Sequence, residues 1–269
     1  MNPAIRPPAV AGAFYPGNPR ILAADVRQML GDVHPAPGRQ PKALIVPHAG
    51  YIYSGPTAAA AYARLAPWKD RISRVILLGP THRVPVRGLA APATDAFATP
   101  LGNIPIDRAA LAGLGDLPQV VVSDTAHALE HSLEVHLPFL QTVLGNFSLV
   151  PLAVGHAPPA AVAEVLERLW GGAETLIVVS SDLSHFLPYT AARETDAGTC
   201  ARILQLDTDI DPEEACGAYP INGLLLAARR HGLRPLLVDQ CNSGDTAGDK
   251  SRVVGYGAFA FYETESGHG

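Results

Sequence analysis

Continuous apolar runs, each bounded by Gly, Pro or Ser, are the dominant hydrophobic pattern of this chain. They do not alternate with polar residues as a half-exposed strand would, so they predict strands buried on both faces of a sheet. The clearest three cover residues 43–47, 74–78 and 175–180. Segments with helical spacing lie between them, and strands therefore alternate with helices along the chain.

The remaining segments extend this alternation. We expect helices over residues 21–30, 57–65, 108–114, 160–170 and 221–230. Further strands are predicted over residues 120–123, 149–154, 236–238 and 253–262. A long irregular stretch through Pro92, Pro100 and Pro105 interrupts the pattern. The predicted fold is a single three-layer α/β/α domain with a mixed central sheet, spanning residues 1–269.

Composition narrows the class of protein. With 269 residues and 48% hydrophobic content, the chain can bury one large core. A net charge of −5 with scattered Lys and Arg argues against a nucleic-acid partner. The N-terminus does not resemble a signal peptide, and no apolar run approaches the roughly 20 residues that span a bilayer. Three sparse cysteines do not form a disulfide framework. We therefore expect a soluble, cytoplasmic protein without membrane contact.

Histidines follow the predicted buried strands. His48 comes directly after the first strand, and His82 follows the second. Ligands collect at the carboxyl ends of strands in open α/β sheets. Neutral imidazole is also the commonest protein ligand for transition metals. A lone histidine is more often a surface or hydrogen-bonded core residue, but two at neighbouring strand ends predict a metal site.

Cys241 is the outstanding candidate for a third metal ligand. It follows the predicted strand that reaches Asp239 and opens a loop of small residues. The alternative interpretation is a half-buried structural thiol. Three carboxylates compete with it as oxygen ligands: Asp239, Asp245 and Asp249. Cys200 and Cys216 are better interpreted as inert, small apolar residues.

Asp182 and His185 form a second candidate pair, past the end of the third strand. Their i, i+3 spacing would place them on one face of a helical first turn. A carboxylate that orients an imidazole raises its basicity, as a catalytic acid/base requires. Alternatively, Asp182 only caps a helix. Ser180 and Ser181 would also permit a Ser/His/Asp hydrolase, but the Gly-x-Ser-x-Gly turn of such enzymes is absent.

Residues 127–136 contain three histidines and two glutamates. On a helix, His127, His131 and Glu134 would share one face, and His136 would fall off it. One interpretation is a solvated helix start. The other makes His131 and Glu134 supporting residues behind the metal ligands, or a wall that contacts substrate.

Five ordered motifs resemble the Memo family, whose bacterial and archaeal branch is called AmmeMemoRadiSam system protein B. They are RPPAVAGAFYP at residues 6–16, PHAGYIYSG at 47–55, GPTH at 79–82, EHSLEVHLP at 130–138 and SSDLSH at 180–185. The resemblance covers essentially the whole chain. It implies a fold similar to the class III, LigB-type extradiol dioxygenases, which hold non-haem Fe(II) with two histidines and a glutamate.

The family resemblance also implies site residues. The ligand pattern carries over onto His48, His82 and Cys241, with Asp182 and His185 lining the same pocket. A thiolate in place of the dioxygenase carboxylate favours copper or iron over a hard ion, and zinc also fits such a site. We therefore expect a metal-dependent redox enzyme with an unidentified small-molecule substrate.

The same resemblance implies two further possibilities. A eukaryotic member is regarded as a signalling adaptor that binds phosphotyrosine peptides, so the alternative function is non-catalytic binding of a small ligand or peptide in the same pocket. The family name also implies a functional link to a radical-SAM protein and to an AMMECR-type protein.

Overall fold

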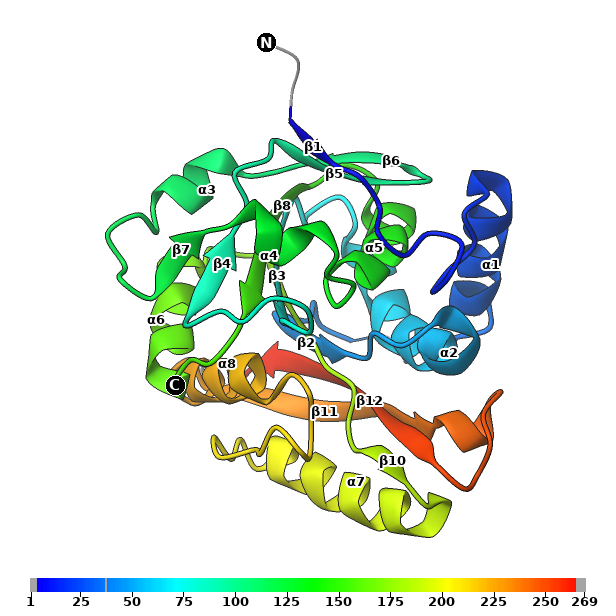
Figure 1. Cartoon of the computed structure of the whole chain (residues 1–269). Helices are drawn as coiled ribbons and strands as arrows, with labels where there is room; N and C mark the ends of the chain where they lie inside the picture. The colour runs from blue at the N-terminus through cyan, green and yellow to red at the C-terminus, as the bar shows by residue number, and fades with distance from the viewer. Residues whose placement is uncertain (1–3, 37, 265–269) are drawn as a thin grey trace.

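Parallel strands β2 (Ala43–Val46), β9 (Thr175–Ser180) and β3 (Arg74–Pro80) form the centre of a nine-stranded sheet (Figure 1). The structure is a computed structural model that describes residues 4–36 and 38–264. The residues of β2 and β9 are all buried, as the continuous apolar runs predict. The carboxyl ends of the three strands therefore meet at one edge of the sheet.

Six more strands complete this sheet in the order β10-β12-β2-β9-β3-β8-β4-β7, with β11 paired to the other side of β12. Their bounds are β8 (Ser148–Val154), β4 (Leu89–Ala91), β7 (Val120–Val122), β10 (His185–Leu187), β11 (Leu233–Asn242) and β12 (Val253–Glu263). β8 runs parallel to β3, whereas β12 runs antiparallel to β2. The prediction of a mixed sheet is confirmed.

Alternate residues of each central strand face two separate cores. In β2, Leu44 and Val46 belong to one core, and Ala43 and Ile45 belong to the other. One core is covered by α1 (Pro19–Gly31), α2 (Tyr51–Tyr62) and α5 (Leu137–Leu144). The opposite core is covered by α6 (Pro159–Leu169), α7 (Tyr189–Leu204) and α8 (Ala218–Arg230). The result is one α/β domain with helices on both faces of its sheet (Figure 1).

A second sheet of three strands occupies much of the stretch predicted to be irregular. It consists of β1 (Ile5–Arg6), β5 (Ala96–Thr99) and β6 (Gly102–Pro105). β5 and β6 are short and lie among prolines, which weakens their strand pattern in the sequence. Their buried side chains, Phe97 and Ile104, join the core beneath α5. The pairing of β1 with β5 joins segments about 90 residues apart in sequence, which no local pattern reveals.

The predicted helices form with shifted ends, and three helices are additional to the predicted ranges: α5, α7 and a short helix over Asp124–Ala128. α2 begins six residues earlier than expected, directly after Gly50, and contains Pro56; the 3₁₀ helix η1 (Ala63–Trp68) follows it. The short helix α3 (Arg108–Ala112) forms as predicted, with Asp107 accepting a hydrogen bond from the Ala110 N–H. Within the described residues, no helix is long and apolar enough to cross a membrane.

Candidate metal centre

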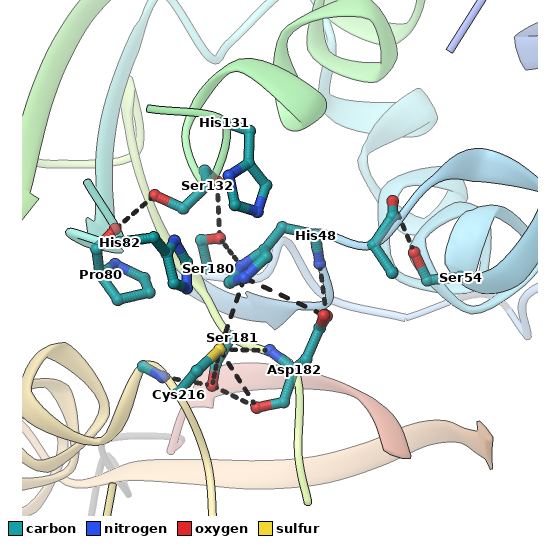
Figure 2. A network of polar contacts seen from close by, with 12 residues as sticks. His48, Ser54, Pro80, His82, His131, Ser132, Ser180, Ser181, Asp182 and Cys216 are labelled. Atoms are coloured by element: carbon teal, nitrogen blue, oxygen red, sulfur yellow. Dashed lines mark hydrogen bonds and ion pairs between the residues drawn. The ribbon is translucent and has the colours of Figure 1, made fainter. Parts of the chain in front are cut away.

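Three imidazoles converge at the carboxyl edge of the central sheet (Figure 2). His48 lies two residues past β2, His82 lies two residues past β3, and His131 lies in the loop after helix α4 (Asp124–Ala128). One nitrogen from each ring lies within 4.8 Å of the others. This spacing allows the three residues to hold one metal ion, in agreement with the strand-end prediction for the first two.

Ser180 fixes which nitrogen of His48 faces the site. The Ser180 hydroxyl donates to the Ser132 carbonyl at 2.6 Å and therefore accepts from the Nδ1–H of His48, also at 2.6 Å. The ring's lone pair is therefore on Nε2, the nitrogen that could bind a metal. Burial, together with the neighbouring imidazoles, holds the pKa of His48 well below its usual range. His48 is consequently neutral, as a ligand must be.

Glu130 orients His82 in the same way. Its Oε1 lies 2.9 Å from His82 Nδ1, and its Oε2 accepts the His82 backbone N–H at 2.6 Å. Burial raises the pKa of Glu130, but the hydrogen bonds from His82 outweigh it and hold the pKa at about 2. The carboxylate is therefore ionised and can only accept, so His82 donates through Nδ1 and presents Nε2.

His131 completes the group from a third direction. Its ring stacks on that of His82 at a centroid distance of 4.7 Å and contacts Phe14 at 4.7 Å. Burial is the main reason why the pKa of His131 falls to about 4. The imidazole is thus neutral at pH 7. The sequence left His131 open between a solvated helix start and a supporting or substrate-contacting residue, whereas the structure groups it with His48 and His82.

Glu130→Gln tests the orientation of His82. The amide keeps a similar shape but loses the negative charge that fixes the Nδ1–H, and we expect metal affinity to fall by about 10- to 100-fold. Calorimetric titration with zinc measures the change. Glu164→Gln, at an exposed glutamate that binds Gln119, is the matched control. Equal affinities in the two variants would show that Glu130 does not position the ligand.

Cys216 lies beside this group, although the sequence suggested an inert thiol. Its Sγ is 3.4 Å from His48 Nε2 and accepts the backbone N–H of Asp182 at 3.3 Å (Figure 2). Gly217 permits this approach, since a Cβ there would lie 2.5 Å from the Ser180 carbonyl oxygen. Burial raises the pKa of the Cys216 thiol to about 12. The one sequence signal is a Cys-Gly pair directly before a helix.

Cys241 does not lie in the three-imidazole group. It pairs with Tyr256 in the β11–β12 ladder, and its thiol lies 3.1 Å from the Thr57 hydroxyl, which donates to Asp239. β12 lies between β11 and β2, so Cys241 is two strands away from the strand that presents His48. Two strand spacings amount to about 9.5 Å. The structure thus brings two of the three predicted ligands together, with His131 as the third member of the group.

Asp182 contacts His48 rather than His185. Its Oδ1 accepts the His48 backbone N–H at 2.8 Å, and its Oδ2 lies 4.0 Å from His48 Nε2. Burial raises the pKa of Asp182 to about 7, against the hydrogen bonds from the His48 and Ala49 backbones. The expected helical turn is wrong, because residues 181–184 are irregular and β10 begins at His185. Burial lowers the pKa of the His185 imidazole.

The remaining candidates of the histidine-rich segment lie apart from one another. α4 ends at Ala128 and the 3₁₀ helix η2 starts at Glu134, so the predicted common helix face does not exist. Glu134 is buried and binds the N-terminal segment, accepting from Arg6 at 2.5 Å and from the Tyr15 hydroxyl at 2.6 Å. His127 packs against Phe97 in the core.

The buried His127 predicts acid sensitivity. Its Nε2 bonds the Ala90 carbonyl at 2.8 Å, while Nδ1 has no hydrogen-bond partner, so protonation would bury an unpaired N–H. Burial lowers the pKa of His127 to about 4. In the unfolded chain, His127 has the ordinary histidine pKa of about 6.5. Between the two pKa values the unfolded chain therefore binds more protons than the folded protein, and the free energy of unfolding falls as the pH drops below 6.5.

We expect His127 to contribute about 2 kcal/mol to the loss of unfolding free energy between pH 7.5 and 5.0. Urea titration of the wild type and of His127→Gln at both pH values measures this contribution. The variant should lose less stability on acidification than the wild type. Parallel pH dependence of the two proteins would exclude the effect.

Comparisons with known proteins identify the family of the chain. A MEMO1 family protein of Ignicoccus hospitalis is 35% identical, over 96% of this chain and 98% of its own. A MEMO1 family protein of Aquifex aeolicus is 36% identical, over 94% of this chain and 97% of its own. The crystal structure of an uncharacterized protein, JW3007, from Escherichia coli K12 matches this structure with a TM-score of 0.52. The match covers 81% of this chain and 99% of that one at 16% sequence identity, so it supports the fold alone. The model of the Memo-like protein family matches residues 6–260, and the chain belongs to this family.

Proposed function

We propose that the protein binds a redox-active transition metal through His48, His82 and His131, and that it acts on a small molecule in the manner of class III extradiol dioxygenases. The observation that carries this proposal is the fixed orientation of two ligands. Ser180 and Glu130 engage Nδ1 of His48 and His82, and each ring keeps Nε2 for a metal. Together with the convergence of the three rings, one nitrogen of each lying within 4.8 Å of the others, this arrangement supports a metal site.

The donor set favours iron or copper. Neutral imidazoles suit iron, copper and zinc alike, and a nearby thiol shifts the preference toward softer ions. Cys216 is the sulfur next to His48 Nε2, at 3.4 Å. Bound iron or copper would supply electron-transfer and oxygen chemistry that side chains lack. Three histidines leave coordination positions open for a substrate.

Asp182 and His185 supply the proton chemistry in this proposal. Asp182, with a pKa of about 7 and its Oδ2 4.0 Å from His48 Nε2, can hold or release a proton near neutral pH. His185 carries a lowered pKa, so it stays neutral and can accept a proton. Both residues would act on substrate without being required as ligands.

Oxygen uptake tests the enzymatic proposal. The protein loaded with Fe(II) or Cu(I) should consume oxygen with a reductant or a phenolic substrate, and removal of the metal should abolish this activity without unfolding the chain. His185→Ala should retain metal and lose turnover. Metal-loaded protein that binds phenolic compounds but consumes no oxygen would favour the alternative function, non-catalytic ligand binding in the same pocket.

Cys216→Ser and Cys241→Ser distinguish the two thiols. We expect the Cys216 variant to lose Cu(I) affinity by about 10-fold or more, because hydroxyl oxygen is a harder donor than sulfur. The Cys241 variant should behave as the wild type. Competition with a chromophoric Cu(I) chelator measures both affinities. If only the Cys241 variant loses copper, the ligand expected from the sequence is the correct one.

A reducing, cytoplasmic setting is proposed from the free thiols. Cys200, Cys216 and Cys241 are all unpaired, which suits a reducing cytoplasm. The link to a radical-SAM protein and an AMMECR-type protein remains an expectation from the family name.

A further inference from the structure

Three adjoining hollows lie at the amino ends of the central strands, on the sheet edge opposite the imidazoles. Their volumes are about 520, 430 and 620 Å³. The first two share Arg39 and Glu263, the last two share Arg234, and Thr264 lines all three. They pass the start of β11 and the end of β12. We call this continuous depression the amino-edge groove.

The amino-edge groove is positively charged, although the whole chain carries a net charge of −5. Four exposed arginines line it: Arg39, Arg71, Arg229 and Arg234. Glu263 is the acidic side chain among the described lining residues. A fifth cation, Lys42, is buried and donates to the carbonyls at the end of α6, and its charge is offset by Glu174 and Glu263.

Apolar side chains lie between these arginines. Trp68 and Tyr262 are half-buried, and Arg71 lies over the Trp68 ring at 5.6 Å. At the other end, Leu204 is 39% exposed beside Leu206. Aromatic and aliphatic surface flanked by arginines is the composition of protein-binding sites rather than of an ordinary solvated face.

We propose that the amino-edge groove binds an acidic, extended segment of a partner protein that also carries apolar side chains. Charge complementarity favours glutamates or aspartates opposite Arg71 and Arg234. Three adjoining hollows that share lining residues, each large enough for a small molecule, fit a peptide better than one compact ligand. The continuous phosphate backbone of a nucleic acid would meet only a short row of cations here.

The groove lies outside the candidate metal centre, so its function is independent of the metal proposal. The two sites occupy opposite ends of the same strands: Lys42 precedes β2, whereas His48 follows it. The metal-site variant His48→Ala should therefore bind a groove ligand as the wild type does.

Fluorescence anisotropy with a labelled twelve-residue peptide of alternating Glu and Leu tests the proposal. The full chain should bind this probe, and the double variant Arg71→Ala/Arg234→Ala should bind about 10-fold more weakly, since two rim charges each account for a few-fold. Raising the salt concentration should weaken wild-type binding. Arg27→Ala, an exposed arginine of α1 on another surface, is the matched control and should not change affinity.

Three results would overturn the proposal. One is the absence of binding to the acidic probe at low salt. Another is equal affinity of the wild type and the Arg71/Arg234 double variant. The third is tighter binding of a matched Lys-Leu peptide or of a single-stranded oligonucleotide, which would assign the groove to a different partner.

Discussion

His48→Ala is expected to reduce metal binding from stoichiometric to background level. The substitution removes the one ligand whose ring is fully buried and fixed by Ser180, and it exposes the buried Asp182 carboxylate to an empty space. Two exposed or half-exposed imidazoles, those of His82 and His131, would remain. Elemental analysis after loading with iron, copper or zinc measures the loss.

His34→Ala provides the matched control, because His34 is exposed and lies in the loop between α1 and the start of β2, whereas His48 follows the end of that strand. This variant should bind metal as the wild type does. Circular dichroism should show that His48→Ala remains folded, so that loss of metal reports loss of a ligand. A folded His48→Ala protein with undiminished metal would contradict the assignment of His48.

Arg6→Ala is expected to lower the free energy of unfolding by about 3–5 kcal/mol. Arg6 is 4% exposed, and its guanidinium donates to Glu134 and to the carbonyls of His127 and Glu130. Its removal leaves the Glu134 carboxylate buried without its cation. Because the same guanidinium ties down the backbone that carries His131, metal affinity should fall as well.

Urea denaturation of the metal-free protein measures the effect. Arg168→Ala is the control, since its ion pair with Asp116 lies at the surface, where such pairs contribute little to stability. A change for Arg6→Ala no larger than for Arg168→Ala would mean that the buried pair does not hold the N-terminal segment in place.

The central sheet was predictable because its signal is local. β2, β3 and β9 are continuous apolar runs, and the turn residues after the first two place His48 and His82 at one edge. Similarity in fold to LigB-type dioxygenases remains an expectation from the resemblance. The short strands β5 and β6 were missed, because their stability comes from pairing partners and from burial of single side chains rather than from a repeated pattern.

The composition of the site was less predictable because it depends on contacts distant in sequence. Cys216, in the loop before α8, lies beside His48 through a contact across 168 residues, whereas Cys241 lies in β11. Glu130 reaches His82 across 48 residues. His131 was read on a helix, whereas an irregular loop brings it beside His82. Local spacing carries no information about such contacts.

Anomalous diffraction from crystals loaded with iron or copper tests the metal centre most directly. We predict one strong peak at bonding distance, about 2.0–2.3 Å, from an imidazole nitrogen of each of His48, His82 and His131. The assignment of the metal site to these three histidines would be contradicted by a peak bound instead to Cys241 and Asp239. The absence of any peak at the three imidazoles in fully loaded crystals would also contradict it.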